Sequence, residues 1–313
     1  MLAHQPRADE KNNSYTIGIC TSGRDAYLHE LIAHIRDHIK NSSLNPEEVI
    51  IIASKPSPSS MKILQSLKED KRFRIIFESE RKGKYEAINR ILQTCSTKYL
   101  VLVNGDALPV GDSINRLLEK LYSDDKLAVV SGVPLVDYNG GIASGIVALM
   151  WSAHNEALKL LSEEGSNRHS CDELIAIRKD LAPILPEGTV NDGAYLSCWA
   201  SANGYRVSYS PKSYVKVRAP KRLGDLIRQR RRISYGHIQV WRRLGMPPTT
   251  VESLAFSRPT VMLKIISRII KGRPKLIISL FPAVIEELFS YTLAVLDATF
   301  HTDRHYVWRR YED

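Results

Sequence analysis

The chain has 313 residues, of which 43% are hydrophobic and 25% charged, and its formal net charge is +10. This composition excludes a disordered or collagen-like chain and provides enough apolar residues for a large core. Four cysteines without a CxxC pair exclude a disulfide framework and a structural zinc site. The charge is uneven, since residues 1–204 carry 23 Lys+Arg against 26 Asp+Glu and residues 205–313 carry 21 against 8. Such a distribution indicates a surface that meets phosphate on a nucleic acid, a membrane or a small ligand.

Strand and helix patterns alternate along the first part of the chain. Residues 1–13 are polar, and we expect a flexible N-terminus that lacks the apolar region of a signal peptide, and therefore a cytoplasmic protein. Apolar β-branched runs predict strands at 15–21, 49–54, 72–79 and 99–104, and helical spacing predicts helices at 25–40, 58–70 and 84–95. This alternation predicts a doubly wound α/β sheet whose ligand lies beyond the carboxyl ends of the strands. No dinucleotide or P-loop fingerprint follows any of these strands.

The pattern changes in the second half of the chain. We expect helices at 111–122, 145–164 and 191–204, and strands at 127–132, 173–179 and 205–210. Between Arg206 and Arg243 there are 12 basic residues and one Asp, and much of this segment is predicted to be helical. Residues 246–313 form a helical, amphipathic extension in which Leu276 to Ile285 and Leu288 to Leu296 are separate apolar runs of 10 and 9 residues. Neither run is long enough to span a bilayer.

Two aspartates are candidates for chemistry. Asp106 follows a predicted strand directly, and a carboxylate there can hold a hard divalent cation that binds a diphosphate. The alternative is a turn-forming Asn-Gly-Asp before a helix cap. Asp192 opens a predicted helix, where it is either a general base for an acceptor hydroxyl or an acid favoured by the helix dipole.

The third candidate is the basic segment 226–243. Arg228, Arg230, Arg231 and Arg232 place at least one guanidinium on any face of a helix, and arginine binds phosphate oxygens bidentately. A solvated basic helix and a nucleic-acid surface are the alternatives. Few aromatic residues and no nucleic-acid-binding signature accompany this segment, so we expect no nucleic-acid partner.

In their order along the chain, these motifs resemble the inverting family 2 glycosyltransferases of the GT-A fold, over approximately residues 14–243. The resemblance implies a Rossmann-like, doubly wound mixed sheet in a catalytic domain spanning residues 14–245. It implies that Asn104-Gly105-Asp106 takes the DXD place that holds Mg²⁺ or Mn²⁺, with Asp106 as the metal ligand. Asn191-Asp192 takes the place of the ED base, which makes Asp192 catalytic. The implied donor-nucleotide residues are Thr21, Ser22, Arg24, Ser54, Gly83, Lys84, Asn89, Asn104, Gly105 and Asp106.

The segment Gln229-Arg230-Arg231-Arg232-Ile233 takes the place of the family's Q-x-x-R-W motif. The resemblance assigns Gln229, Arg231 and Arg232 to the pyrophosphate and the acceptor. Ile233 replaces the tryptophan of a motif that is most complete in polymer synthases, and this favours single additions. Asn104 replaces the first acid of DXD, and Ser54-Lys55 replaces an Asp that often reads the base, so uracil and guanine both stay open, with UDP-sugars favoured.

The expected function is metal-dependent transfer of a sugar from a nucleotide-diphosphate sugar to the hydroxyl of a glycan or lipid-linked acceptor. A non-catalytic nucleotide-sugar-binding module is the alternative, and a nucleic-acid-binding protein is a weaker one. Residues 260–275 combine apolar and basic side chains as interfacial helices do, which predicts peripheral attachment to an anionic membrane at its cytoplasmic face. Packing on the catalytic domain or in a dimer is the alternative for these helices.

Overall fold

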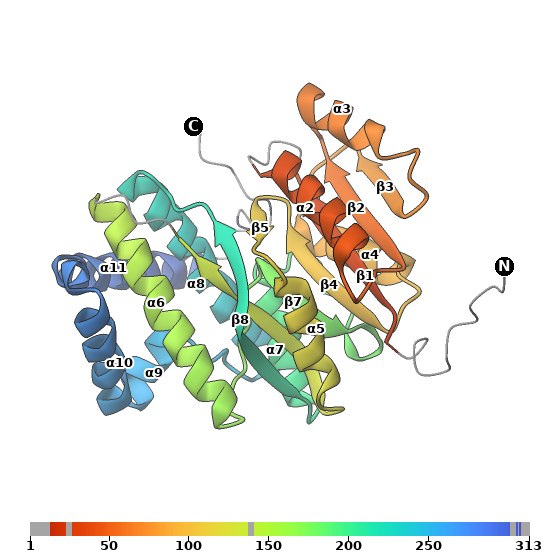
Figure 1. Ribbon diagram of the computed structural model, residues 1–313. Helices are drawn as coiled ribbons and strands as arrows, with labels where there is room; N and C mark the ends of the chain where they lie inside the picture. Colours follow the sequence, from red (N-terminus) through yellow and green to blue (C-terminus); the bar gives the residue numbers. More distant parts are fainter. Residues whose placement is uncertain (1–12, 23–26, 137–140, 301–304, 306, 308–313) are drawn as a thin grey trace.

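The computed structural model describes residues 13–22, 27–136, 141–300, 305 and 307. Within these residues eight strands form one mixed sheet in the order β3-β2-β1-β4-β7-β6-β8-β5 (Figure 1). The expected flexible residues 1–12 lie outside the described part. The strands are β1 (Tyr15–Thr21), β2 (Glu48–Ser54), β3 (Phe73–Glu78), β4 (Tyr99–Asn104), β5 (Ala107–Pro109), β6 (Leu127–Leu135), β7 (Leu174–Arg178) and β8 (Arg206–Val217).

The direction of the strands decides which loops meet. β1 to β4 are parallel, whereas β7 runs antiparallel to β4, with Leu174 paired to Val103. The residues that precede β7 therefore lie at the same edge of the sheet as those that follow β4. A backbone hydrogen bond from the Asn104 N–H to the Glu173 carbonyl, 3.2 Å long, joins the two segments.

Helices cover both faces of the sheet because its central strands are apolar on both sides. In β2, Ile51 faces one core, with α2, α3 and α5, while Ile50 and Ile52 face the other, with α4 and α7. Side chains of β2 are fully buried on both faces, so β2 lies between the two layers of helices. These helices are α2 (Leu28–Asn41), α3 (Pro58–Ser66), α4 (Lys84–Thr94), α5 (Ser113–Tyr122) and α7 (Asp192–Ala202).

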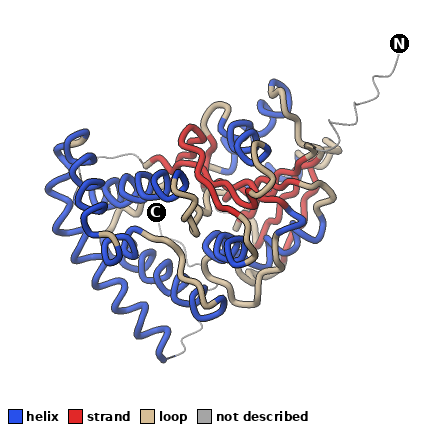
Figure 2. Tube along the Cα trace, turned by 90° about the horizontal axis from the view of Figure 1, so that it is seen from below, coloured by secondary structure: helices blue, strands red, loops and turns tan. Residues whose placement is uncertain are grey.

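The remaining helices gather at one end of the sheet and enclose a third hydrophobic core (Figures 1 and 2). Leu149 of α6, Leu226 of α8, Leu254 of α9 and Ile265 of α10 are buried together in this core. The segments are α6 (Ile142–Glu163), α8 (Leu223–Leu244), α9 (Val251–Ser257), α10 (Pro259–Gly272), η2 (Pro274–Ser279) and α11 (Leu280–Phe300), while a short 3-10 turn, η1 (Lys179–Leu181), follows β7.

The two expected apolar runs near the C-terminus are continuous in the structure, because η2 leads directly into α11 and α11 contains the whole of the second run, so the prediction that they are separate was wrong. Pro282 lies in the first turn of α11. Proline is tolerated there because a backbone N–H in the first turn has no acceptor within the helix. Glu286 and Glu287 do not interrupt the helix. Glu287 accepts hydrogen bonds from Arg230 of α8, and the buried Glu286 accepts one from Ser290 on its own helix at 2.6 Å. By length and composition alone, residues Pro274–Phe300 are sufficient to cross a membrane.

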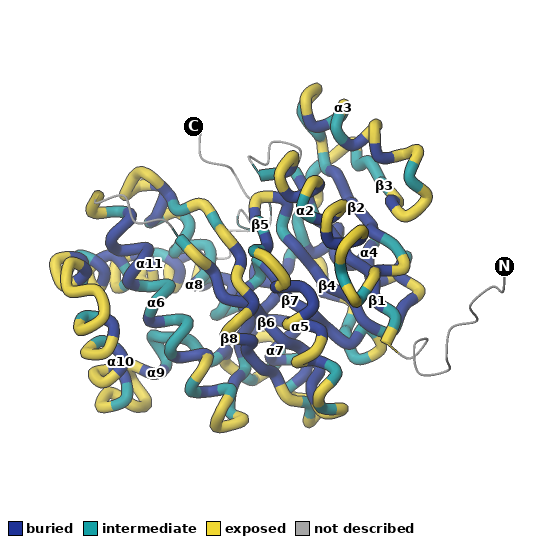
Figure 3. Tube along the Cα trace, viewed as in Figure 1, coloured by how far each residue is buried: buried dark blue, intermediate teal, exposed yellow. Residues whose placement is uncertain are grey.

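α11 buries its polar side and exposes its apolar side. Glu286, Ser290 and Asp297 are 4%, 0% and 4% exposed against the rest of the protein. The outward side chains, between 40% and 77% exposed, form a surface that we call the apolar face. The colouring of the chain trace in Figure 3 distinguishes buried from exposed residues. Its residues are Ile277, Ile278, Phe281, Val284, Ile285, Leu288, Phe289, Tyr291, Val295, Leu296 and Phe300.

Candidate active site

A cavity of about 720 Å³ lies beyond the carboxyl ends of the parallel strands, where a doubly wound sheet is expected to bind its ligand. Loops after β1, β2 and β4 and the first turns of α4 and α7 line one part of it, and α6 and α8 to α11 line the rest. The sequence-nominated residues in its lining are Thr21, Ser22, Ser54, Gly83, Lys84, Asn104, Asp106, Asp192, Gln229 and Arg232. The fold thus brings these distant motifs to one place.

Other nominated residues lie behind the cavity wall. Asn89 is buried and exchanges two hydrogen bonds with the backbone of Leu185: its Nδ2 donates to the carbonyl at 2.9 Å, and its Oδ1 accepts from the N–H at 2.8 Å. Gly105 is buried, and its N–H donates to the Cys20 carbonyl at 2.9 Å. Asn89 and Gly105 therefore hold cavity loops in place, while Arg24 lies outside the described residues.

Asp106 is positioned by the two backbone bonds that fix the turn after β4, one to β1 and one to the segment before β7. Its side chain is exposed into the cavity. Desolvation by the surrounding protein raises the pKa of Asp106, and the positive charges of Lys84 and Arg218 oppose that rise. The Asp106 carboxylate therefore opens into the cavity beside two cations that partly compensate its charge.

A divalent cation at Asp106 needs further oxygen atoms from a bound substrate to complete its coordination. The described residues contain no group of three or more His, Cys, Asp or Glu side chains that could hold a metal ion. Mg²⁺ and related cations commonly use one or two protein carboxylates and complete their coordination with substrate phosphates and water. Asp106, which opens into the cavity, suits a cation of this kind that arrives with a diphosphate.

Asp192 begins α7 at the wall of the cavity. Asn191 caps the helix, since its side chain accepts a hydrogen bond from the Ala194 N–H at 3.0 Å. This cap fixes the first turn, and the Asp192 side chain is 4% exposed. Its Oδ2 lies 2.8 Å from the Nζ of Lys84, the first residue of α4. The ion pair orients the carboxylate between the two helix N-termini.

The sequence analysis missed two further acids, Asp172 and Glu173, which also line the cavity. They immediately precede β7, and the antiparallel direction of that strand carries them to the edge where Asp106 lies. Asp172 packs against Gly193 so closely that a Cβ on Gly193 would overlap its carboxylate. The sequence shows two acids directly before an apolar strand. They could be assigned to the cavity only if the direction of that strand in the sheet were known.

Lys84 is shared between two carboxylates, and the sharing is unequal. Its Nζ is 3.9 Å from Asp172, against 2.8 Å from Asp192. Burial first and the neighbouring Asp192 second raise the pKa of Asp172 well above its ordinary value, although Lys84 opposes this. Burial lowers the pKa of Lys84, but the two carboxylates outweigh it and the pKa is raised. The arrangement therefore places one cation beside two acids, at 2.8 Å from Asp192 and 3.9 Å from Asp172.

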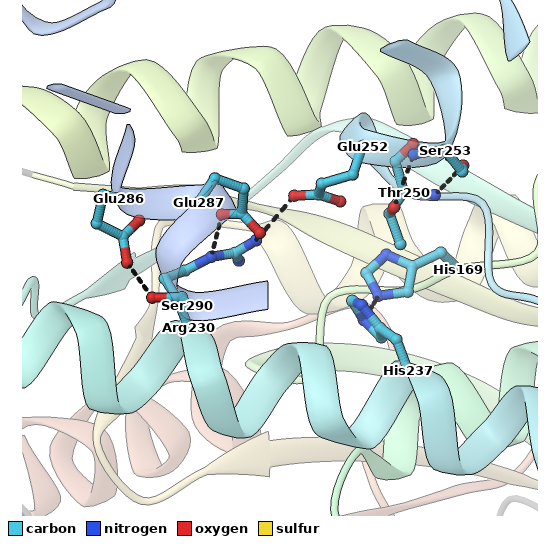
Figure 4. Close-up of polar contacts among 9 residues, drawn as sticks. All are labelled: His169, Arg230, His237, Thr250, Glu252, Ser253, Glu286, Glu287 and Ser290. Carbon is cyan, nitrogen blue, oxygen red and sulfur yellow. Dashed lines mark hydrogen bonds and ion pairs between the residues drawn. The ribbon is translucent and has the colours of Figure 1, made fainter. Parts of the chain in front are cut away.

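The basic helix α8 directs its arginines to different places. Arg230 is 17% exposed and donates to Glu252 at 2.8 Å and to both carboxylate oxygens of Glu287 at 2.8 and 2.9 Å (Figure 4). Arg231 pairs with Asp297 on α11 and is not among the cavity-lining residues of the described chain. These two arginines attach α9 and α11 to α8.

Gln229 and Arg232 line the cavity, as does Arg230 beside its two glutamates. Arg232 donates to the carbonyl of Val190, just before Asn191, at 3.1 Å, so it also supports the loop that leads into α7. Ile233 lines the cavity beside it. Within the described chain, four of the five motif residues therefore line the cavity, and Arg231 does not.

Three histidines form an unexpected cluster in the same cavity. The rings of His154 and His237 each meet the ring of His169 edge-on, with centroids 5.1 Å apart. Figure 4 shows His169 and His237, whose Nε2 atoms are 3.2 Å apart. Burial lowers the pKa of His169 to about 4 and that of His237 to about 3, so both rings are uncharged at neutral pH. The Nε2 of His154 and the Nδ1 of His169 have no hydrogen-bond partner within the described structure.

Comparison with known proteins gives a family match, relatives of similar sequence and a solved structure of similar fold. Residues 16–183 match the family model described as glycosyl transferase family 2. The chain is similar to the poly-beta-1,6-N-acetyl-D-glucosamine synthase of Staphylococcus aureus strain COL, with 22% identity over 198 residues, 62% of this chain and 48% of that protein. The synthase of Staphylococcus epidermidis is 20% identical over 213 residues, 67% and 52% of the two chains. The chain spans about half the length of these curated relatives.

A solved structure extends the likeness beyond the family match. The mannosyltransferase PcManGT from Pyrobaculum calidifontis, in complex with GDP-Man and Mn²⁺, superposes with a TM-score of 0.61 and 17% sequence identity. The likeness covers 92% of this chain and 87% of that one. At this identity it shows the fold alone, and the predicted GT-A architecture is confirmed.

Proposed function

Because the chain belongs to glycosyl transferase family 2, we propose that its cavity binds a nucleotide-diphosphate sugar and transfers the sugar, with inversion, to an acceptor hydroxyl. The observation that supports this most strongly is that Asp192 and Asp106 line one cavity at the edge of the sheet, with Lys84 held 2.8 Å from Asp192. UDP-sugars are the favoured donors. The alternative, a module that binds such donors without turning them over, does not require a buried acid beside the sugar site.

In the proposed reaction Asp192 is the general base. Its carboxylate accepts the proton of the acceptor hydroxyl while the oxygen forms a bond to the anomeric carbon of the donor. The bond between that carbon and the diphosphate oxygen breaks on the opposite face, and its electron pair leaves with the nucleoside diphosphate. Lys84 orients the carboxylate, and the capped first turn of α7 restricts its movement.

Negative charge grows on the leaving diphosphate during this step, and cavity-lining cations stabilise it. We assign Arg218 and Arg232 to this role, because both line the cavity. Mg²⁺ or Mn²⁺ bound at Asp106 would add Lewis-acid stabilisation of the same oxygens.

We propose that each catalytic cycle adds one sugar and releases the product. Ile233 lines the cavity where the family motif has tryptophan, and an isoleucine offers no aromatic face on which a growing sugar chain could stack. Mass spectrometry of the products checks this: products extended by one sugar are expected, and a ladder of longer products from single encounters contradicts it.

We also propose that the C-terminal helices attach the enzyme to the cytoplasmic face of an anionic membrane. The apolar face supports this attachment, and exposed Lys271, Arg273 and Lys275 immediately precede it. Flotation with anionic vesicles at low salt is expected to recover the protein, with less recovery at high salt or with neutral vesicles. Absence from the anionic vesicles at low salt contradicts the attachment.

Donor binding is tested first, by calorimetry with UDP- and GDP-sugars in Mn²⁺ or in EDTA. The wild type is expected to bind one donor more tightly with Mn²⁺, and Asp106→Asn is expected to lose most of that gain while keeping its EDTA affinity. The physical reason is that an amide lacks the negative charge that a hard cation prefers. Equal metal dependence in the wild type and the variant rejects the metal role of Asp106.

A further inference from the structure

The cavity that contains Asp192 does not end at the sugar site. It continues between α6, α10 and α11 into a region that we call the apolar arm. Carboxylates and arginines dominate the lining near the strand ends, whereas hydrocarbon side chains dominate the arm. An arm of this kind excludes a free sugar and suits a hydrocarbon chain. The residues that define it are Met150, Met262, Ile266, Ala283, Val284 and Leu288.

The apolar arm reaches the surface at the apolar face. Val284 and Leu288 line the cavity, yet they are 51% and 59% exposed on the outer side of α11. They therefore belong both to the arm and to the apolar face. This continuity provides an apolar path from the proposed membrane surface to the interior of the enzyme.

The histidine cluster lies in the lining of the same cavity, together with the arm and Asp192. His154 and His169 each have a buried ring nitrogen without a hydrogen-bond partner in the described structure, and an uncharged imidazole can donate to or accept from a hydroxyl. The nearby Arg230 already donates hydrogen bonds to Glu252 and Glu287, and the Glu252 carboxylate balances its charge (Figure 4). This part of the cavity therefore suits an uncharged, hydroxyl-bearing group better than a phosphate.

We propose that the acceptor is a membrane amphiphile, with a hydroxyl-bearing uncharged head beside the histidine cluster and a hydrocarbon tail in the apolar arm. The proposal rests on the proposed function, because it names the acceptor of that same transfer. The tail enters at Val284 and Leu288, the head passes His154 and His169, and one hydroxyl reaches Asp192. A membrane, rather than a second protein, is the source of this acceptor, because exposed lysine and arginine residues precede the apolar face.

The test uses the full chain, a sugar nucleotide that it turns over, and matched methyl, octyl and dodecyl glycosides of glucose, mannose and N-acetylglucosamine below their micelle concentrations. In the wild type, KM for the acceptor is expected to fall by up to about fourfold per methylene added along the arm, and then to level off. Dodecyl phosphate, which has the same tail and a charged head, is expected to be a poor acceptor and a weak inhibitor.

Two variants on the exposed side of α11 make the comparison specific. Val284→Trp narrows the mouth of the arm, and losing contact with two methylenes raises KM for the dodecyl glycoside roughly tenfold. KM for the donor and for the methyl glycoside is expected to stay the same. Thr292→Trp adds equal bulk at an exposed position outside the cavity lining and is expected to change none of these values.

The outcomes separate the two proposals. A wild-type KM that does not depend on chain length, or equal effects of Val284→Trp and Thr292→Trp, overturns the amphiphile acceptor, while transfer to methyl glycosides would leave the proposed function standing. Tight competition by dodecyl phosphate rejects the uncharged head. If no UDP- or GDP-sugar is turned over with any acceptor or with water, the proposed function fails and the acceptor proposal fails with it.

Discussion

Lys84 and the two carboxylates beside it define the chemistry of the cavity at the scale of single residues. The lysine is closer to Asp192 than to Asp172 by about an ångström. Burial and the charge of Asp192 raise the pKa of Asp172, so this acid retains its proton to higher pH than an exposed aspartate does.

Gly193 has no side chain, and this leaves room for the Asp172 carboxylate. We expect Gly193→Ala to disturb the site without unfolding the protein. The new Cβ would meet the Asp172 carboxylate and lie 3.0 Å from the Ser170 Oγ, so the flexible acid side chain has to move. A displacement of this size beside the reacting groups is expected to reduce kcat by about tenfold to a hundredfold.

The matched control is Gly224→Ala, because nothing lies within 4 Å of a Cβ built on Gly224 in the first turn of α8. This variant is expected to keep wild-type kcat and to be slightly more stable. Steady-state kinetics and thermal unfolding of both variants check the prediction. Equal kcat for the two alanine variants would show that the close approach at Gly193 has no functional role.

At the scale of elements, α8 both lines the cavity and holds α11 to the rest of the protein. Removing Arg230 leaves Glu252 and Glu287 buried without their cation, so Arg230→Met is expected to lower the free energy of unfolding by about 3–5 kcal/mol. Arg231 is 37% exposed, and its partner Asp297 keeps His305 at 2.7 Å. Arg231→Met is therefore expected to lose no more than about 1 kcal/mol.

Urea unfolding of the two methionine variants measures this difference. Both remove one positive charge from the same helix, so changes in net charge cancel in the comparison. Equal losses of stability would mean that the buried network of Arg230 does not anchor α9 and α11.

The sequence predicted most elements of the sheet because their apolar patterns are strong and local. The runs at 15–21 and 99–104 coincide with β1 and β4, and the helix at 84–95 differs from α4 by one residue. β5 has only three residues and no pattern of its own, and it exists because β8 pairs with it. α11 was divided in the prediction because its two glutamates are polar in sequence, although Glu287 pairs with Arg230, which lies far away along the chain, and Glu286 is buried beside Ser290.

The candidate site could be predicted only where a motif lies directly after a strand or at the start of a helix. Asp106 and Asp192 have such positions, and both line the cavity. Asp172 was missed because the direction of β7 cannot be read from its residues. His154, His169 and His237 come from three separate segments, and no spacing in the sequence connects them.

At the scale of the whole molecule, one cavity connects the edge of the sheet with the C-terminal helices. Glu287 holds α11 to Arg230 of α8, and its protonation makes the docking of α11 sensitive to pH. Burial raises the pKa of Glu287 from 4.5 to about 7, although Arg230 opposes this. The folded protein therefore holds a proton on Glu287, between pH 4.5 and 7, that the unfolded chain releases.

This extra proton predicts how stability changes with pH. Because the folded state binds the proton more tightly, raising the pH from 4.5 to 7 removes stability, by up to about 3 kcal/mol from this group. Glu287→Gln is expected to lack this contribution, so wild-type stability should fall relative to that variant over this range. Glu163→Gln, at an exposed position, is the control and should follow the wild type. Parallel curves for the wild type and Glu287→Gln would contradict the assignment.

The central claim is that Asp192 is the base of a sugar transfer in this cavity. The most direct test measures kcat for nucleotide release and sugar transfer by the wild type, Asp192→Asn and the control Asp180→Asn, whose aspartate is exposed in η1. Asp192→Asn is predicted to bind the donor as the wild type does and to lose about 10²- to 10⁴-fold in kcat, while Asp180→Asn keeps wild-type turnover. A folded Asp192→Asn enzyme with near wild-type kcat would contradict the account.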